Sequence, residues 1–280
     1  MILITTAGKV GAEAARLLAA QGQPVRILIR DPAKATALAE AGVDVVQGDL
    51  DVPETIAAAM QGVSSVILVS LAIPSQELSV VDSAVRAGVP HIVKVTSKAS
   101  ADSPIARRRG QTEIEEGLIA SGLGYTLLRN NVYMQNFLML APAIAATSSF
   151  GANTGDGLAG MVDSRDVAAV AAQIAADPGP HQGKTYWITG PAAISYADAA
   201  RVFSTVLGRP IAFRQLTDEE QRQAMINVGV PEHIAEMNVQ AFALLAQGDA
   251  DWVSDDLAAI IGRRARSFEQ FGTDHAAAFS

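Results

Sequence analysis

The first residues suited to chemistry are the glycines and hydroxyl groups of Thr5-Thr6-Ala7-Gly8-Lys9-Val10-Gly11. A turn between an apolar run and a helix-period stretch directs backbone N–H groups and the positive helix end toward one point. A pyrophosphate suits that field, with Gly8 admitting a phosphate near the backbone and Gly11 allowing the helix to pack on the strand. Thr5 or Thr6 can add a hydroxyl donor. Only the last two glycines of the G-x-G-x-x-G fingerprint are present, so an ordinary glycine turn is the alternative.

A second candidate site consists of two charged residues, Arg30 and Asp31, which follow the next apolar run. At this position of a dinucleotide-binding fold, an acidic residue binds the ribose diol of NAD, whereas a cation binds the 2′-phosphate of NADP. Arg30 comes first, and Lys34 adds a positive charge one turn into the following helix. We therefore predict NADP(H) as the cofactor, with NAD as the alternative that Asp31 leaves open. A plain surface role for Arg30 is the other alternative.

A third candidate, Gly48-Asp49-Leu50, follows the third apolar run. On a loop at the carboxyl edge of a parallel sheet, Asp49 could accept a hydrogen bond from the adenine amino group while Leu50 covers the ring. The alternative is a turn in which Asp49 caps the helix expected from Pro53. The two interpretations are compatible.

Polar residues also follow the later apolar runs, where the carboxyl edge of an open parallel sheet would place them around the nicotinamide. Lys98 could orient the nicotinamide ribose or stabilise negative charge on a carbonyl oxygen, and an exposed loop lysine is the alternative. Tyr133 could donate to a substrate oxygen or stack on a flat ring, and an aromatic packed under a lid is the alternative. Lys98 and Tyr133 are the catalytic candidates, with Asn130 beside them. The predicted apolar wall is Phe137, Met134 and Met139. The predicted cofactor-binding residues are Thr6, Gly8, Lys9, Val10, Gly11, Arg30, Lys34, Asp49, Leu50, Ser70, Leu71, Ser97 and Asn131.

The elements that must hold these residues follow from the hydrophobic pattern of the first half of the chain. Short, almost wholly apolar runs alternate with helix-period segments, as in parallel sheets covered on both faces. Prolines at helix starts and glycines just past helix ends mark the boundaries. The predicted strands are Ile2–Thr5, Val25–Ile29, Val43–Gln47, Ser65–Ser70, His91–Thr96 and Tyr125–Leu128. The predicted helices are Val10–Gln21, Pro32–Ala41, Pro53–Met60, Gln76–Ala87 and Ile105–Ser121.

Strands joined by helices in this way form a right-handed, doubly wound sheet, so the predicted fold is α/β with a parallel Rossmann-type sheet. After residue 130 the pattern loosens, and no second βαβ series follows. We predict that residues 1–130 form an NAD(P)-binding domain and that residues 131–280 form a smaller α/β substrate-binding lid region, partly interleaved with the first. The predicted helices of this region are Val132–Ala146, Ser164–Ala176 (capped by Asp163 or Ser164), Tyr196–Leu207, Thr217–Asn227 and Pro231–Gln247. Its predicted strands are Lys184–Thr189 and Ile211–Leu216, and Thr147–Gly160 is predicted to be a loop.

Composition excludes several classes of function. The 280 residues carry a formal net charge of −8, which argues against nucleic acid as a direct partner, and the basic run Arg107-Arg108-Arg109 is interpreted as a solvated helix start. There is no cysteine, and the four histidines are dispersed, so we expect neither disulfides nor a metal site. No leader sequence and no apolar run of ~20 residues is present, so we expect a cytoplasmic protein without membrane spans. A homodimer is left open.

Seven segments of the chain carry a family resemblance that extends over nearly its whole length. They are TTAGKVG, LIRDPAKATAL, GDLDVPETI, QTEIEEGLIASGLGYTLLRNNVYMQNF, MVDSRDVAAVAAQ, GKTYWITGP and SFEQF. Together they resemble the NmrA-like family of atypical short-chain dehydrogenases, which includes bacterial NADPH-dependent quinone oxidoreductases and triphenylmethane reductase. The block SGLGYTLLRNNVYMQN is the most specific of them.

Two departures from family patterns bear on the chemistry. The phosphate loop is one residue shorter and one glycine poorer than is usual in the family. The Tyr-x-x-x-Lys pair of ordinary short-chain dehydrogenases is absent, since its Tyr would fall at Arg107 and its Lys at Gln111, and most NmrA-like members also lack it. The resemblance therefore implies an NAD(P)H-dependent oxidoreductase that reduces a quinone or another flat, electron-poor substrate, with protons supplied by water. A redox-sensing regulator that binds the dinucleotide and a protein partner without turnover is the alternative.

Overall fold

The computed structural model describes residues 1–280 and contains one seven-stranded sheet in which every neighbouring pair of strands is parallel. The strand order is β3-β2-β1-β4-β5-β6-β8. The strands are β1 (Ile2–Ile4), β2 (Val25–Ile29), β3 (Asp44–Gln47), β4 (Ser65–Leu68), β5 (His91–Ser97), β6 (Gly124–Asn130) and β8 (Lys184–Ile188). This order confirms the predicted doubly wound α/β fold, because the strand sequence reverses its direction between β1 and β4.

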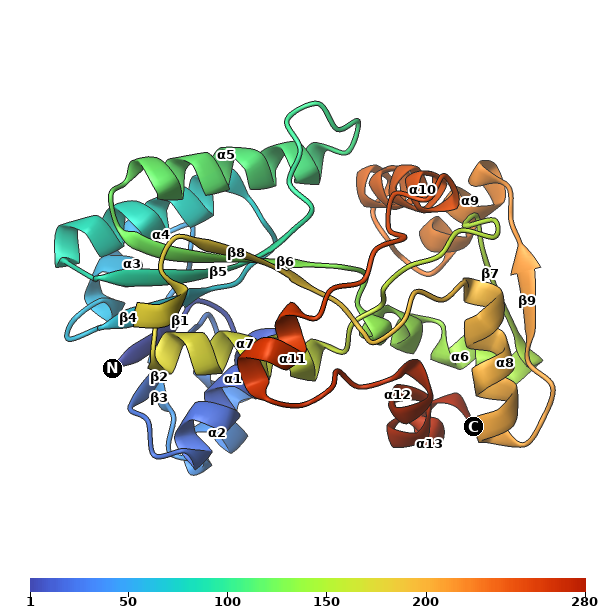
Figure 1. The fold of residues 1–280 in the computed structure, drawn as a ribbon, viewed down its shortest axis with the longest axis horizontal. Coiled ribbons are helices and arrows are strands. Elements are labelled where there is room, and N and C mark those ends of the chain that lie inside the picture. The colour runs from blue at the N-terminus through green and yellow to red at the C-terminus, as the bar shows by residue number, and fades with distance from the viewer.

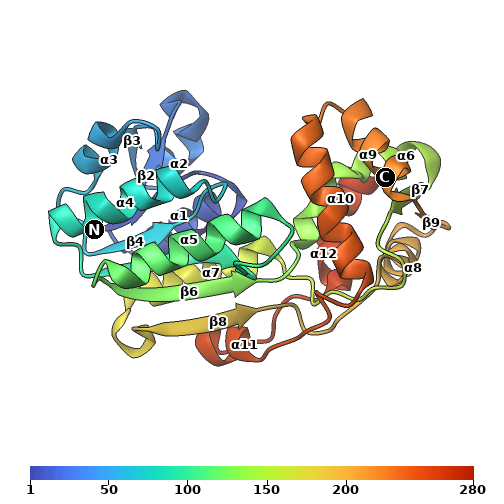
Figure 2. The ribbon, with the colours of Figure 1, turned by 90° about the horizontal axis from the view of Figure 1, so that it is seen from above.

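Helices cover both faces of the sheet, and the alternation of side chains in the strands explains why. Ile2 and Ile4 belong to the core on one face, whereas Leu3 belongs to the core on the other. The first face is covered by α1 (Lys9–Ala20), α2 (Thr36–Glu40), α7 (Ser164–Ala176) and α11 (Asp256–Ile261). The second face is covered by α3 (Pro53–Ala59), α4 (Pro74–Ala87) and α5 (Ala106–Ala120). Figure 2 shows α4 and α5 lying side by side in front of the strands.

The predicted boundaries of these helices are largely confirmed. Pro53 occupies the first turn of α3 as predicted, where a missing N–H leaves no acceptor unpaired. Pro74 does the same in α4, which begins two residues before the predicted start at Gln76. Gly88 ends α4 with a φ of 68°, a left-handed conformation that an L side chain would strain. Pro32 begins a short 3₁₀ turn, Pro32–Ala35, so the helix predicted over Pro32–Ala41 is divided between that turn and α2.

The remaining elements form a lid with its own core (Figure 1). Strands β7 (Ser149–Ala152) and β9 (Ala212–Gln215) pair in parallel, and they are surrounded by α6 (Ala141–Thr147), α8 (Tyr196–Leu207), α9 (Asp218–Asn227), α10 (Glu232–Ala246), α12 (Phe268–Asp274) and α13 (Ala276–Phe279). Aromatic rings fill this core. Phe137 lies at its centre, with ring centroids 4.9 Å from Tyr196, 5.0 Å from Phe268 and 5.7 Å from Phe203. The lid is therefore a packed unit.

Two predictions about the lid are wrong. Thr147–Gly160 is not all loop, because Ser149–Ala152 forms β7, whose partner β9 lies about sixty residues later in the chain. Val132–Ala146 is not one helix. It is a 3₁₀ segment, Met134–Met139, followed by α6, because Pro142 cannot donate to the preceding turn.

The chain returns to the sheet after building part of the lid. Helix α7 packs on α1, and β8, predicted as Lys184–Thr189, lies beside β6 as the edge strand. Residues beyond 130 thus contribute a strand and two helices to the dinucleotide-type fold, and a functional division at residue 130 stays a prediction. None of the helices is both long and apolar enough to span a bilayer.

Candidate functional site

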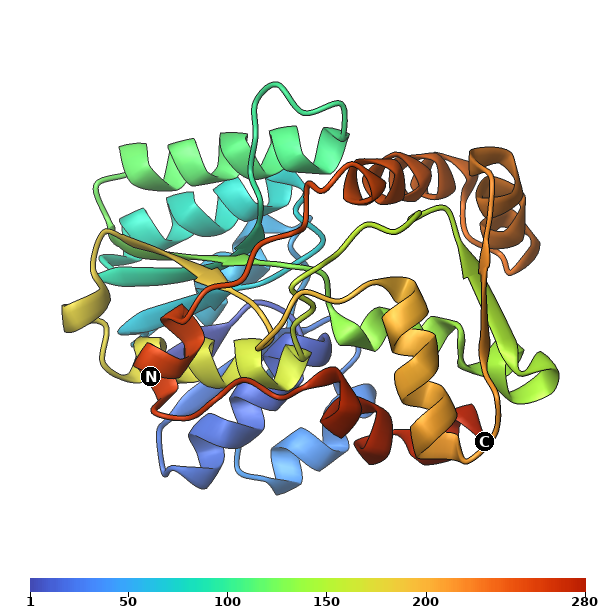
Figure 3. The same cartoon turned by 45° about the vertical axis from the view of Figure 1, so that its right-hand side comes forward.

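A cleft of about 1190 Å³ lies between the carboxyl ends of the strands and the lid. It includes the point where the strand order reverses between β1 and β4, which is where ligands bind in open parallel sheets. Figure 3 shows the lid elements standing opposite these strand ends. Of the predicted cofactor-binding residues, Gly11 alone does not line the cleft, while Lys98 and Tyr133 both do.

The loop from Thr6 to Gly11 presents free backbone donors to this cleft. The N–H group of Thr5 is bonded to the carbonyl of Ile67, and that of Ala12 is bonded to the carbonyl of Gly8. The six N–H groups between them donate to no protein acceptor. Together with the start of α1, they form a field that favours an anion, as the glycine-containing turn predicted.

The two glycines of the loop have different roles. A Cβ added at Gly11 would overlap the carbonyl oxygen of Thr6, so only glycine lets α1 pack against the loop. A Cβ added at Gly8 would meet nothing closer than the Thr6 hydroxyl at 3.9 Å, so the space beside Gly8 is open to the cleft. Gly11 therefore fixes the shape of the loop, and Gly8 leaves room for a ligand against the backbone.

The hydroxyl groups of the loop are used internally. Thr5 Oγ1 and Thr6 Oγ1 each donate to the carbonyl oxygen of Val69 at 2.8 Å, which ties the loop to the end of β4. Thr6 thus offers a ligand its backbone N–H. Lys9 Nζ donates to the carbonyl oxygen of Gln135 in the lid at 3.2 Å, and burial lowers the pKa of this lysine. Lys9 is consequently a link between the loop and the lid.

Arg30 and its neighbours form the end of the cleft beside β2 and β3. The Arg30 guanidinium has no carboxylate partner and no hydrogen bond within the protein, and it lines a hollow of about 350 Å³ together with Asp49. Asp31 accepts a hydrogen bond from the N–H of Ala33 and faces Lys34 Nζ at 3.7 Å. The carboxylate that could bind a ribose diol is therefore partly engaged, whereas the cation that could bind a 2′-phosphate is free.

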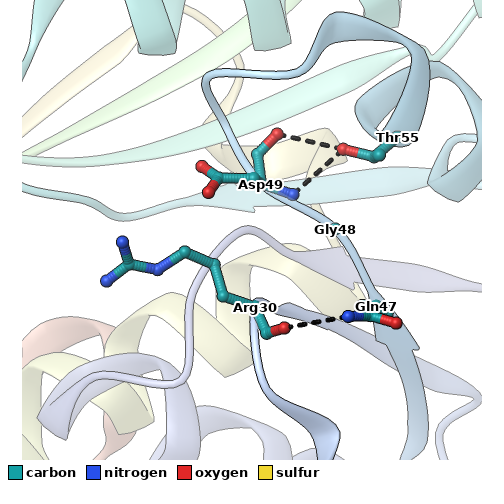
Figure 4. A pocket seen from close by; sticks show the side chains of 5 residues that line it. All are labelled: Arg30, Gln47, Gly48, Asp49 and Thr55. Atoms are coloured by element: carbon teal, nitrogen blue, oxygen red, sulfur yellow. Dashed lines mark hydrogen bonds between the residues drawn. The ribbon is translucent and has the colours of Figure 1, made fainter.

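Figure 4 shows Arg30 and Asp49 extending in the same direction from neighbouring strand ends. Thr55 Oγ1 bonds both to the N–H and to the carbonyl oxygen of Asp49, each at 3.0 Å, and Asp49 Oδ1 accepts from the N–H of Asp51. Asp49 thus lies in a turn, but the prediction that it caps the helix from Pro53 is wrong, because the N-cap of α3 is Val52 and no side chain caps it. Adenine binding stays a prediction. Leu50 is buried in the sheet core and also borders the cleft.

The segment after β4 is held by a buried ion pair. Ser70 Oγ donates to Glu77 Oε1 at 2.6 Å and accepts from the N–H of Ala72, so its hydroxyl is engaged within the protein. Glu77 in turn faces Lys94 Nζ at 2.8 Å, and both side chains are fully buried. Leu71 is 83% exposed at the rim of the cleft, which is where a ligand could cover it.

Lys98 is bound across the cleft. Its Nζ donates to Asp249 Oδ1 at 2.7 Å and to the Asp249 carbonyl oxygen at 3.2 Å, and Arg108 donates to the other carboxylate oxygen at 2.5 Å. Partial burial alone would raise the pKa of Asp249, but the hydrogen bonds from Arg108 and Lys98 hold it below its ordinary range. Asp249 therefore joins the end of β5 to the segment after α10.

Tyr133 and Asn130 form a pair beside Lys98 in the cleft wall. Asn130 Nδ2 donates to the Thr96 carbonyl at 2.8 Å and to the Tyr133 hydroxyl at 3.2 Å, while Asn130 Oδ1 is buried without a partner. Burial raises the pKa of Tyr133, so the phenol stays protonated at neutral pH. Its O–H has no acceptor within the protein and can donate to a ligand.

The other two residues predicted near the nicotinamide, Asn131 and Ser97, differ in whether their side chains are free to bind a ligand. Asn131 uses its side-chain amide to bind the carbonyls of Ala250 and Trp252 and its own Oδ1 to accept from the N–H of Val132, so it joins β6 to the C-terminal segment. Ser97 lines the cleft, and its hydroxyl has no hydrogen bond within the protein. A cofactor role for both residues stays a prediction.

The lid closes the cleft with apolar side chains. Phe137 and Met139 line it as predicted, whereas Met134 does not, because it is buried in the lid core. Further apolar lining comes from Phe150, Tyr196, Met225, Phe242, Leu245 and Trp252. This half of the cleft can therefore hold a flat apolar ring system.

Sequence reasoning missed three residues of the site. Asp249 binds Lys98 but lies 151 positions away, so no local pattern indicates the pairing. Arg107 and Gln111 also line the cleft. Arg107 is exposed, as expected for a solvated cation, but its place in the cleft was not predicted, and Gln111 was considered only as unable to do acid–base chemistry. Their spacing of four in a helix was the available signal, since it places both on one helix face.

Asp163 and Asp166 have structural roles, and the capping role of Asp163 was predicted. Asp163 caps α7 by accepting from the N–H of Arg165 at 2.8 Å. Asp166 is fully buried and binds Arg263 and Arg266 of the C-terminal segment. No three histidine or acidic side chains lie close enough to hold a metal ion.

The fold and this cleft define a dinucleotide-binding α/β protein with a lid. The model of the NmrA-like family matches residues 1–269, and the chain belongs to the NmrA-like family. The family predicted from the sequence segments is thereby confirmed.

Relatives of known name extend over the full chain. NAD(P)H azoreductase of Xenophilus azovorans is 36% identical over 283 residues, covering 100% of this chain and 99% of the relative. The (4-alkanoyl-5-oxo-2,5-dihydrofuran-3-yl)methyl phosphate reductase of Streptomyces griseus is 37% identical over 287 residues, with the same coverage. The crystal structure of an Escherichia coli NADPH-dependent quinone oxidoreductase in complex with NADPH has a TM-score of 0.88 and 30% identity, covering 99% of this chain and 100% of that one.

Proposed function

We propose that the protein is an NADPH-dependent oxidoreductase that reduces a flat, electron-poor acceptor such as a quinone or an azo compound. The observation that carries this proposal is a single cleft whose two ends have different chemistry. One end offers six free N–H groups and an unpaired Arg30. The other end is walled by the aromatic and aliphatic side chains of the lid.

The residues present at the first end fit the cofactor. The N–H groups from Thr6 to Gly11 would hold the pyrophosphate, and the open space beside Gly8 is the cradle that a Cβ would fill. Arg30 would neutralise the 2′-phosphate, with Lys34 near it. When bound, NADPH supplies a hydride.

At the second end, the chain must orient the acceptor and compensate the charge that its reduction creates. Tyr133 keeps its proton and can donate it in a hydrogen bond to an acceptor oxygen or nitrogen. Asn130 holds the phenol in place by donating to its oxygen. Lys98 supplies a positive charge nearby, although Asp249 fixes its position. No side chain here is needed as a base, since reduction consumes a proton that water can supply.

The names of the relatives agree with this assignment. One is an NAD(P)H azoreductase, and the solved quinone oxidoreductase was crystallised with NADPH. We assign the protein to the cytoplasm, because the reaction depends on a supply of NADPH. The absence of direct nucleic-acid binding stays a prediction, and a homodimer is left open.

The test is the oxidation of NADPH, followed at 340 nm, with a panel of quinones and azo compounds. We expect acceptor-dependent oxidation that is faster with NADPH than with NADH. Binding of NADPH, measured by calorimetry, without turnover of any acceptor would contradict the enzyme and favour the regulator. Absence of binding to either dinucleotide would contradict the assigned cofactor site itself.

A further inference from the structure

Two side chains of α5 bear on which acceptors the cleft can bind. Arg107 and Gln111 are one helical turn apart, and both line the cleft. Both belong to the N-terminal half of α5, and Figure 1 shows that this end of the helix is the one nearest to α10 of the lid. Neither residue has a role in the cofactor-binding end of the cleft.

Gln111 has no partner within the protein. Its side chain takes part in no hydrogen bond, its Oε1 is buried without a partner, and the residue is only 5% exposed. A buried amide without a partner destabilises a fold, and such groups usually have one. The amide can turn its Nε2 donor or its Oε1 acceptor toward a ligand at no cost in internal bonds.

Arg107 is also without a partner. No carboxylate lies within 4 Å of its guanidinium, and it donates no hydrogen bond within the protein, unlike Arg108, which binds Asp249. The residue is exposed within the open cleft, so its guanidinium is accessible to a ligand. An anion beside it would also interact with the neighbouring positive charge of Arg108.

The wall of the cleft around Arg107 is also positively charged. Lys98, Arg107 and Arg108 line this part of the cleft against one carboxylate, that of Asp249. The whole cleft is lined by seven lysine and arginine residues and four aspartates, although the chain carries a net charge of −8. A cationic cleft in an acidic protein attracts anions to that cleft.

The cofactor phosphates do not account for this wall. Arg30 follows β2, whereas α5 follows β5, and the strand order places three strand spacings between them, roughly 14 Å. The free N–H groups of the phosphate loop lie at the end of β1, between the two positions. Arg107 therefore lies on the acceptor side of the cleft.

We propose that Arg107 and Gln111 form a subsite for an oxyanion carried by the acceptor, so that the preferred substrates are flat aromatic compounds bearing a sulfonate, carboxylate or phosphate group. The guanidinium binds the anion, the Gln111 amide donates to one of its oxygens, and the apolar wall of the lid packs on the ring. This inference specifies the substrate class of the proposed function and rests on it for the reaction, but not for the binding.

A matched pair of fluorescent ligands tests the subsite without turnover. Protein saturated with NADP⁺ is titrated with 8-anilinonaphthalene-1-sulfonate and with N-phenyl-1-naphthylamine, which has the same ring system without the charge. In R107Q we expect the dissociation constant of the sulfonate to rise about tenfold, as for loss of a charge-assisted hydrogen bond, and that of the neutral ligand to change less than twofold. The control is R264Q, which removes an equal charge from an exposed arginine outside the cleft.

A second variant separates binding from stability. Q111L replaces the amide with an apolar group of similar size and removes an unpartnered buried polar group, so the melting temperature should stay equal or rise. The same variant should bind the sulfonate about threefold to tenfold more weakly. A fall in melting temperature without loss of sulfonate affinity would assign Gln111 to the fold and overturn its part in the subsite.

Three results would overturn the proposal. In the first, R107Q weakens the binding of the charged and the neutral ligand equally. In the second, R264Q weakens the binding of the sulfonate as much as R107Q does. In the third, R107Q lowers the affinity for NADPH, which would assign the arginine to the cofactor. Failure of the proposed function looks different. The protein would then reduce no acceptor with NADPH, whereas the difference between the charged and neutral ligands would remain.

Discussion

The two ends of the cleft are built from different materials. The cofactor end is made largely of backbone, since one continuous loop carries six N–H groups without a protein acceptor there and Gly11 fixes its shape. The acceptor end is made of side chains that come from α5, the end of β6, the segment after α10 and the lid core. The cofactor end is formed mainly by a single turn of the chain, whereas the acceptor end is formed by side chains that only the tertiary fold brings together.

This difference has a functional consequence. A backbone site depends little on which side chains surround it, so it suits a cofactor that stays the same. A side-chain site changes its chemistry with single substitutions, so it suits an acceptor that differs among relatives. The relatives fit this division, because one is named for azo compounds and another for a phosphorylated dihydrofuran.

The strongest test of the backbone end is G11A. The added methyl group would overlap the carbonyl oxygen of Thr6, so α1 or the loop must move. We expect NADPH affinity to fall by more than about a hundredfold and the free energy of unfolding to fall by about 2 kcal/mol or more, as in overpacked cores. Calorimetry with NADPH and urea unfolding measure the two effects.

G8A is the matched comparison for that variant. The space beside Gly8 is open, so the fold should keep its stability within about 0.5 kcal/mol while a methyl group partly fills the ligand space. Cofactor affinity should therefore fall without a fall in stability. Equal stability losses in G8A and G11A would show that the two glycines do not have the separate roles assigned to them.

The next largest effect is expected from R30Q, which removes the guanidinium that we propose binds the 2′-phosphate of NADPH. The guanidinium has no partner within the protein, so its removal should cost affinity for NADPH and little stability. We expect NADPH to bind about tenfold to a hundredfold more weakly and NADH to bind within about twofold of wild type. An equal loss for both dinucleotides would place the 2′-phosphate elsewhere.

A smaller effect is expected from Y133F at the acceptor end. The variant removes the O–H that can donate to the acceptor but keeps the ring. We expect kcat to fall about tenfold with the NADPH dissociation constant unchanged, because the cofactor end is separate and water can still supply protons. A fall of more than about a thousandfold would make the phenol an obligatory acid.

The contrast between the two ends also explains how far the sequence could predict them. The strands, the helices around them and the phosphate loop were predictable, because each leaves a local mark such as Pro53 at a helix start or Gly88 after a helix end. Strand β7 left no such mark. Its four residues include Gly151, whose lack of a side chain makes room for Leu216, and its partner is remote in the sequence.

At the site, the sequence indicated which residues follow the strands but not what binds them. Lys98 was named as a candidate, yet its partner Asp249 is 151 residues away. Asn131 was named for the cofactor, yet its amide is used by Ala250 and Trp252. The buried, partnerless state of Gln111 follows from the packing of α5 on the sheet, and no local pattern expresses it.

The smallest predicted effect concerns Asp249, the link between the sheet and the lid. Its pKa is held below the ordinary value of 3.8 by hydrogen bonds from Arg108 and Lys98, so the carboxylate stabilises the fold above about pH 4, and this contribution is lost as the pH falls through the lowered pKa. D249N should therefore cost on the order of 1 kcal/mol between pH 5 and 8, and the difference from wild type should shrink below pH 4. Urea unfolding at a series of pH values measures this. A difference that stays constant down to pH 3 would show that Asp249 contributes through packing, and the end of β5 and the segment after α10 would then be joined without its charge.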